Sequence, residues 1–146
     1  MLLLILLLGG LFRFYNLNWD QGYMYNPDEM NLAMAVSRVR IPGQGDPGFY
    51  AYNGLPIYLY KLAGQLLAMI TGEEAWAISL DRIALIGRFI AALVASVSVC
   101  LVFSLGKVYL GGLGGLLAAA FCALSVGLIQ TSHFGTTESL LVFFCC

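Results

Sequence analysis

Charged side chains are scarce in this sequence. Only 10% of the 146 residues are charged, whereas 60% are hydrophobic. Soluble domains typically carry ~25% charged residues, so a water-soluble fold of this length would lack polar surface. The net charge of -1 and the lack of any Lys/Arg run give no electrostatic footprint for nucleic acid. We therefore predict an integral membrane protein that does not bind nucleic acid.

The sequence also lacks the motifs of a metal or redox site. It has one histidine and four cysteines, and no cysteine pair has C-x-x-C or Cys/His ligand spacing. All four cysteines lie in apolar stretches, so we interpret them as small apolar packing residues. They carry no information on the redox compartment. The residues identify no cofactor with certainty, and a divalent metal remains an open alternative.

The N-terminus lacks the features of a signal peptide. No basic residue precedes the first apolar run, and no small-residue cleavage site follows Leu8. We predict a membrane span over residues 2–19 instead. Arg13 lies near its far end, where a long side chain can extend toward the headgroups. Tyr15 and Trp19 are aromatic residues of the kind found at that interface.

Two long apolar runs follow, at residues 83–106 and 113–131, each long enough for the ~20 residues that cross a bilayer. The glycines of residues 111–115 predict a tight turn between them. A fourth span begins near Ser139 and reaches only residue 146. Because a helix end within hydrocarbon leaves backbone groups unpaired, we expect the natural chain to continue. The predicted fold class is all-α, a multi-pass bundle of transmembrane helices.

A long loop, residues 20–81, separates the first two spans and carries seven of the eight acidic residues. Residues 41–48 read as turn, whereas residues 55–71 are apolar but contain Lys61 and Gln65. We favour a helix at the membrane surface for residues 55–71 over a true span. The loop 20–81 and the loop 132–138 then lie on one side of the membrane. Lys107 weakly places the glycine turn in the cytoplasm and both loops outside.

The first candidate site is Asn26-Pro27-Asp28-Glu29. One interpretation is structural: Asn26 is a good N-cap, Pro27 suits the first helical position, and Glu29 would complete a capping box. The helix that follows would place Met30, Ala33 and Met34 on one side. The other interpretation is catalytic, with Asp28 and Glu29 as paired carboxylates. Local physics alone favours capping.

The second candidate site is the segment 132–138, with His133 and Glu138. Glu138 either caps the fourth helix or is a functional carboxylate at the membrane edge, and His133 either binds metal or forms a hydrogen bond. If the two loops share a membrane face, Glu138 would converge with Asp28 and Glu29 on one cavity. Two arginines, Arg82 and Arg88, would lie at the same face. Carboxylates near guanidinium groups suit a lipid-linked phosphate substrate.

The order of these segments resembles the N-terminal part of membrane glycosyltransferases that use polyprenyl-phosphate sugars. It is most similar to the protein O-mannosyltransferase and aminoarabinose-transferase-like family, with the C-type glycosyltransferase fold. The resemblance rests on four segments: FRFYNLNWDQGYMYNPDEMNLAMAVSRV, FYAYNGLPIYLYKLAGQLLAMITG, the span opening LIGRF, and SHFGTTESLLVFF. It covers essentially the whole chain.

The resemblance implies roles for particular residues. Asp28 takes the place of the catalytic carboxylate, and Glu29 and Glu138 that of supporting acids. The implied substrate contacts are Arg82, Arg88, His133, Tyr52 and Lys61. The sequence departs from the family pattern in two places. Asn53, Gly54 and Leu55 replace the acidic and lysine residues of some members, which weighs against an aminoarabinose substrate and a metal site. Separately, the basic turn between the second and third spans is reduced to Lys107.

The predicted function is transfer of a sugar from a polyprenyl-phosphate donor to a lipid, glycan or protein acceptor. The resemblance implies a bacterial plasma membrane with extracytoplasmic active loops, and we expect no transfer by these 146 residues alone. The alternative is a transporter or channel in which Glu138 and His133 line a polar pathway. A noncatalytic membrane scaffold is a third interpretation. Transporters place ionisable groups near the bilayer midplane, whereas here they cluster at the edge.

Overall fold

The computed structural model describes residues 1–52 and 54–146, and all regular structure in these residues is helical. This confirms the all-α prediction. The described residues form two compact units. The first comprises Met1–Leu17, Phe89–His133 and Glu138–Cys146; the second comprises Asn18–Arg88 and Phe134–Thr137. Asn53, one of the departures noted above, lies outside the described residues.

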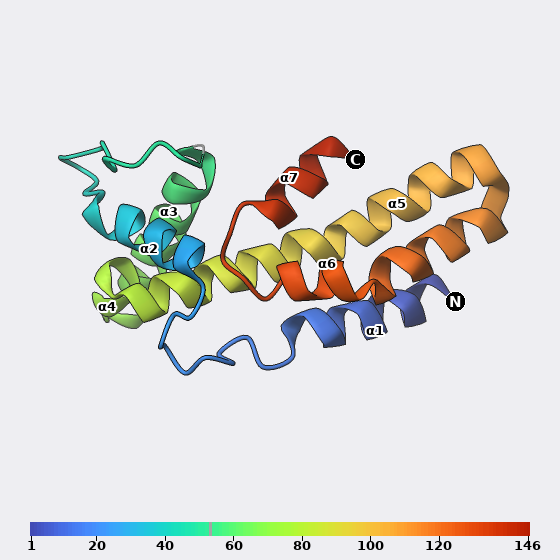
Figure 1. Ribbon diagram of the computed structural model, residues 1–146, viewed down its shortest axis with the longest axis horizontal. Helices are drawn as coiled ribbons and strands as arrows, with labels where there is room; N and C mark the ends of the chain where they lie inside the picture. Colours follow the sequence, from blue (N-terminus) through green and yellow to red (C-terminus); the bar gives the residue numbers. More distant parts are fainter. Residues whose placement is uncertain (53) are drawn as a thin grey trace. The chain divides into compact units, whose positions relative to one another are not determined.

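The first unit is built around a reversing helix. Helix α5 (Leu80–Leu124) turns back at Gly111, where φ is 76° and the backbone is not helical. Figure 1 shows the two arms of α5 side by side beyond this turn, and a Cβ added to Gly106 would lie 3.0 Å from the Gly115 Cα. The predicted glycine turn is therefore present. Helices α1 (Leu2–Phe14), α6 (Val126–Thr131) and α7 (Glu138–Cys145) complete the unit.

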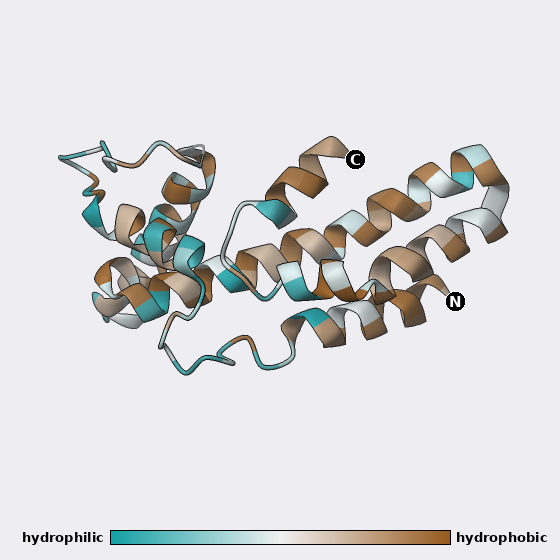
Figure 2. Cartoon of the chain, viewed as in Figure 1, coloured by the Kyte–Doolittle hydropathy of each residue, from teal (hydrophilic) through white to brown (hydrophobic). Residues whose placement is uncertain are grey.

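The predicted spans are reproduced in part. Within the described residues, one helix, Leu80–Leu124, is long and apolar enough to cross a membrane, and Figure 2 shows that many residues along its arms are hydrophobic. Helix α1 ends at Phe14 rather than residue 19, because the backbone is extended at Tyr15 and left-handed at Asn16, where φ is 52°. The predicted span 113–131 is interrupted at Ser125, which separates α5 from α6.

The second unit contains three helices of the predicted loop, α2 (Pro27–Arg38), α3 (Gly54–Thr71) and α4 (Ala75–Ile78), with the first turns of α5. Residues 41–48 contain no helix, as expected for a turn. Residues 55–71 are helical, and α3 packs closely on α4: a Cβ added to Gly64 would lie 2.5 Å from the Trp76 carbonyl oxygen.

The buried side of α2 differs from the predicted one. Leu32, Ala33 and Val36 are buried together with Glu29, whereas Met30 is exposed. Of the three residues predicted to share one side of the helix, Ala33 is buried, Met34 is half-buried and Met30 is exposed. The helix is instead oriented by the Glu29 carboxylate, which points to a buried arginine described below.

Candidate functional site

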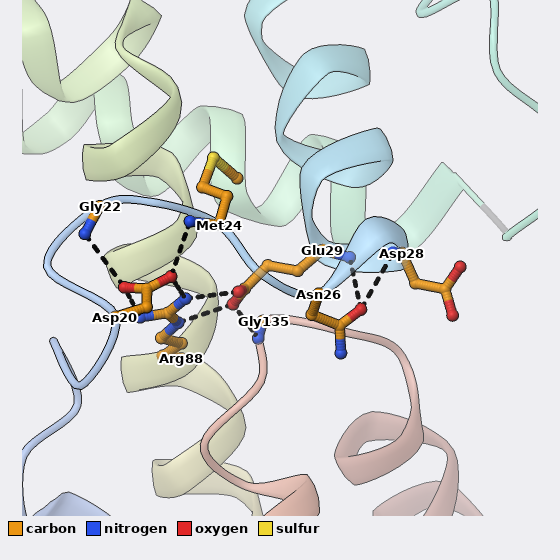
Figure 3. A network of polar contacts seen from close by, with 8 residues as sticks. All are labelled: Asp20, Gly22, Met24, Asn26, Asp28, Glu29, Arg88 and Gly135. Carbon is orange, nitrogen blue, oxygen red and sulfur yellow. Dashed lines mark hydrogen bonds and ion pairs between the residues drawn. The ribbon is translucent and has the colours of Figure 1, made fainter.

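A buried cluster of three charged side chains, Asp20, Glu29 and Arg88, lies in the second unit (Figure 3). Arg88 Nε donates to Glu29 Oε1 at 2.7 Å, and its NH1 donates to Asp20 Oδ1 at 2.7 Å. The remaining nitrogen, NH2, contacts both carboxylates, at 2.6 Å from Asp20 Oδ2 and 2.5 Å from Glu29 Oε2. Each carboxylate thus receives two charge-assisted hydrogen bonds in a fork geometry.

The cluster fixes the start of α2 from one side, and Asn26 fixes it from the other. Asn26 is the N-cap, and its side-chain oxygen accepts the backbone N–H groups of Asp28 at 2.9 Å and Glu29 at 3.3 Å. The predicted N-cap and the proline at the first helical position are confirmed. The predicted capping box is wrong, because the Glu29 carboxylate bonds Arg88 and Gly135 rather than the Asn26 backbone.

Two glycines bring the segment 134–137 onto this cluster. Gly135 N–H donates to Glu29 Oε1 at 2.7 Å, and a Cβ on Gly87 would lie only 2.9 Å from the Gly135 Cα. Tyr60 adds a long hydrogen bond of 3.4 Å to the Thr136 carbonyl oxygen. The two polar loops that the sequence placed on one side of the membrane therefore contact each other in this unit.

Two carboxyl groups share one guanidinium in this cluster, because Arg88 pairs with both Asp20 and Glu29. The Arg88 hydrogen bond, aided by the Gly22 and Met24 N–H groups, lowers the pKa of Asp20 from 3.8 to about 2, against the opposing effect of burial. The Arg88 guanidinium also lies 5.2 Å from the Trp19 ring centroid, within cation–π range. Arg88 was predicted to contact a substrate phosphate. Its nitrogens face carboxylates instead, and the phosphate role stays a prediction.

Asp28 occupies a different position from its neighbour. Its side chain is exposed and points away from Arg88, whereas Glu29 points toward it (Figure 3). The two neighbouring carboxylates therefore point in different directions: the Glu29 side chain is buried against Arg88, and the Asp28 side chain is exposed to solvent. A negative charge in the first turn of a helix interacts favourably with the backbone dipoles.

The other predicted site residues of the second unit serve separate contacts. Arg82 lies over the Trp76 ring at 4.5 Å and forms an exposed ion pair with Glu73 at 3.8 Å. Lys61 is buried, and its Nζ donates to the Ala77 carbonyl oxygen at 2.8 Å. Burial, followed by the charge of Arg40, lowers the pKa of Lys61. Lys61 therefore joins α3 to α4. The Tyr52 ring packs on Phe49 with centroids 5.6 Å apart.

His133 and Glu138 belong to the first unit. The His133 ring has its Nδ1 2.8 Å from the Ile129 carbonyl oxygen and its Nε2 3.0 Å from that of Tyr15. Glu138 is exposed in the first turn of α7. Its predicted convergence with Asp28 stays a prediction, because Asp28 belongs to the second unit.

Sequence reasoning missed Asp20 and Gly135. Asp20 was counted only as one of seven loop acids. The available signal was its place directly after Trp19, together with Arg88 near the start of a long apolar helix. Such a pattern is typical of an ion pair at the membrane edge. Gly135 carried no local signal, because its role is to leave space for Gly87 and to offer a backbone N–H to Glu29.

No metal centre is evident in the part of the chain that the structure describes, where no three His, Cys, Asp or Glu side chains are grouped to hold an ion. Comparison with family models, curated proteins and solved structures finds no match to this chain. The family resemblance therefore rests on the quoted residues alone.

Proposed function

We propose that this chain carries the catalytic loop of a membrane glycosyltransferase that moves a sugar from a polyprenyl-phosphate donor to a lipid, glycan or protein acceptor. One observation carries the proposal: Asp28 is an exposed carboxylate on a helix start that is held by the Asn26 cap and by the buried Glu29–Arg88 pair. A general base needs this combination of access to substrate and fixed position.

In the proposed reaction, the Asp28 carboxylate accepts the proton of an acceptor hydroxyl. The hydroxyl oxygen then attacks the anomeric carbon of the donor sugar. The bond between that carbon and the phosphate oxygen breaks, and the polyprenyl phosphate leaves with the electron pair. Arg82, whose side chain is partly exposed, is the candidate for stabilising the phosphate charge. Arg88 and Glu29 act as positioning residues for the helix that bears Asp28.

The proposal includes a multi-pass topology in a bacterial plasma membrane, with the second unit outside the cytoplasm. The apolar arms of α5 support insertion in a membrane. Between Arg88 and Lys107, the described α5 sequence carries no ionisable side chain other than that of Cys100. This pattern favours a transferase over a transporter, since a transported ion or polar substrate calls for polar groups near the midplane.

The test is sugar transfer by the full-length polypeptide in liposomes, with a polyprenyl-phosphate sugar as donor. Asp28→Asn keeps the shape of the side chain but removes the base, so transfer should fall by about 100- to 10,000-fold. Stability should change by only ~0.3–1 kcal/mol, from the lost charge near the helix dipole. Glu74→Gln is the matched control, because Glu74 is another exposed acid of the second unit. Near-normal turnover in Asp28→Asn would contradict the catalytic role and leave Asp28 with only a structural role at the start of α2.

A further inference from the structure

An open pocket of about 490 Å³ lies where the loop before α3 meets the first turn of that helix. It is separate from the Arg88 cluster and shares none of its residues. The described residues that line it are rich in aromatic rings and include one carboxylate: Asp46, Pro47, Phe49, Tyr50, Gly54 and Tyr58.

The side-chain hydroxyls of this pocket already form hydrogen bonds within the protein. The Tyr50 hydroxyl lies 2.7 and 2.9 Å from the two Asp46 carboxylate oxygens and donates to that group. The Tyr58 hydroxyl donates to the Gly45 carbonyl oxygen at 3.1 Å, and the Gly48 N–H donates to Asp46 at 2.9 Å. The side chains that line the pocket therefore offer a ligand hydrogen-bond acceptors and aromatic rings.

From this arrangement we infer that the pocket binds an ammonium group of a small molecule or lipid headgroup. A cation gains from the faces of aromatic rings and from a nearby carboxylate. No lysine, arginine or histidine is among the described lining residues. The Gly48 N–H and the Tyr50 hydroxyl lower the pKa of Asp46, so this carboxylate is ionised at neutral pH. A ligand rich in hydrogen-bond donors fits these acceptors, and the charge of the Asp46 carboxylate repels an anion.

The exposed side of α3 indicates where such a ligand comes from. Four exposed apolar side chains follow Tyr58 at helical spacing, namely Leu62, Leu66, Met69 and Ile70. Tyr58 thus belongs both to the pocket and to the start of this apolar surface. A zwitterionic phospholipid can place its ammonium group in the pocket and its apolar part along α3. A free amine would use the pocket alone.

The experiment compares choline with 3,3-dimethyl-1-butanol, which has the same shape without the charge. Both are titrated against the purified chain in a non-ionic detergent, and binding is followed by ligand-observed NMR. We expect choline to bind at least tenfold more tightly than the neutral alcohol. Asp46→Asn should remove most of this difference, whereas Glu74→Gln, an exposed acid away from the pocket, should preserve it. Circular dichroism checks that each variant keeps its helices.

Equal binding of the two compounds, or choline binding that is unchanged in Asp46→Asn, would overturn the inference, as would glucose binding more tightly than choline. A second arm identifies the source: Asp46-dependent binding to phosphatidylcholine vesicles in preference to phosphatidylglycerol vesicles assigns the site to a lipid headgroup. The inference is independent of sugar transfer, because it concerns binding by residues that the proposed reaction does not use.

Discussion

Glu29 and Arg88 lie 59 residues apart in the chain and form a buried ion pair, with nitrogen–oxygen distances of 2.7 and 2.5 Å. Both side chains are almost completely excluded from solvent. Desolvation opposes the burial of such a pair, so it adds little net stability compared with an apolar pair. It does specify one arrangement of α2 and the start of α5, since any other leaves a buried charge without its partner.

Arg88→Met should therefore be strongly destabilising, because it leaves the carboxylates of Asp20 and Glu29 buried without a cation. Breaking a buried pair in this way costs about 3–5 kcal/mol. Arg82→Met is the matched control, since its ion pair with Glu73 is long and exposed and such pairs contribute about 0–1 kcal/mol. Denaturant unfolding of the purified chain measures both. Equal losses in the two variants would mean that the cluster is not the anchor.

The Asp20 carboxylate should make stability depend on pH. Its pKa falls from 3.8 to about 2 in the folded state, so the folded state binds fewer protons than the unfolded state in this range. The linked stabilisation, about 2 kcal/mol, is fully present above about pH 4 and is lost as the pH falls toward 2. Unfolding measured from pH 2 to 5 should show this slope in the natural chain and a smaller one in Asp20→Asn. Identical slopes would contradict the prediction.

The sequence predicts well what local chemistry determines. Asn26-Pro27 begins a helix because its cap needs only two adjacent N–H groups, and Gly111 marks the reversal of α5 because its φ is positive. The contacts that sequence reasoning missed are long-range. Glu29 meets the requirements of a capping box, yet a buried guanidinium 59 residues away is a stronger partner than a backbone N–H. Asp20 is identifiable as a site residue only once Arg88 is placed beside it.

Asn26→Ala tests the cap separately from the ion pair. Alanine cannot accept the N–H groups of Asp28 and Glu29, so the variant should lose ~1 kcal/mol. Asn26→Asp keeps an acceptor at the same place and should retain most of the stability. Thermal unfolding of the three chains gives the comparison. Because Glu29 and Arg88 still hold the helix, Asn26→Ala should lower the free energy of unfolding much less than Arg88→Met does. A decrease of the same size in both variants would show that the whole cluster depends on the cap.

Gly87→Ala should be destabilising for a steric reason. The added Cβ would lie 2.9 Å from the Gly135 Cα and 3.0 Å from the Tyr60 ring, so backbone must move. Overpacking of this kind costs about 1–3 kcal/mol. Gly10→Ala is the control, because nothing lies within 4 Å of its Cβ position and alanine favours a helix. The melting temperature should fall in Gly87→Ala and rise slightly in Gly10→Ala. Equal melting temperatures would show that the close contact between Gly87 and Gly135 does not limit side-chain size at position 87.

The reversal of α5 leads to a prediction about topology. Its arm from Leu80 to Leu110 is about 46 Å long at 1.5 Å per residue, longer than a ~30 Å hydrocarbon core. If this arm crosses the membrane, Gly112 lies on the opposite side from the loop that holds Gly45. Thr137 belongs to the same compact unit as that loop, so it should share the side of Gly45.

Cysteine labelling tests this topology. Single cysteines at positions 45, 112 and 137, in a chain whose four natural cysteines are replaced by serine or alanine, can be tested in intact cells. A membrane-impermeant maleimide should label positions 45 and 137 at once and position 112 only after permeabilisation. Labelling of 112 together with 45 would show that α5 does not cross, whereas labelling of 45 and 137 on opposite sides would show that the chain between them crosses an odd number of times.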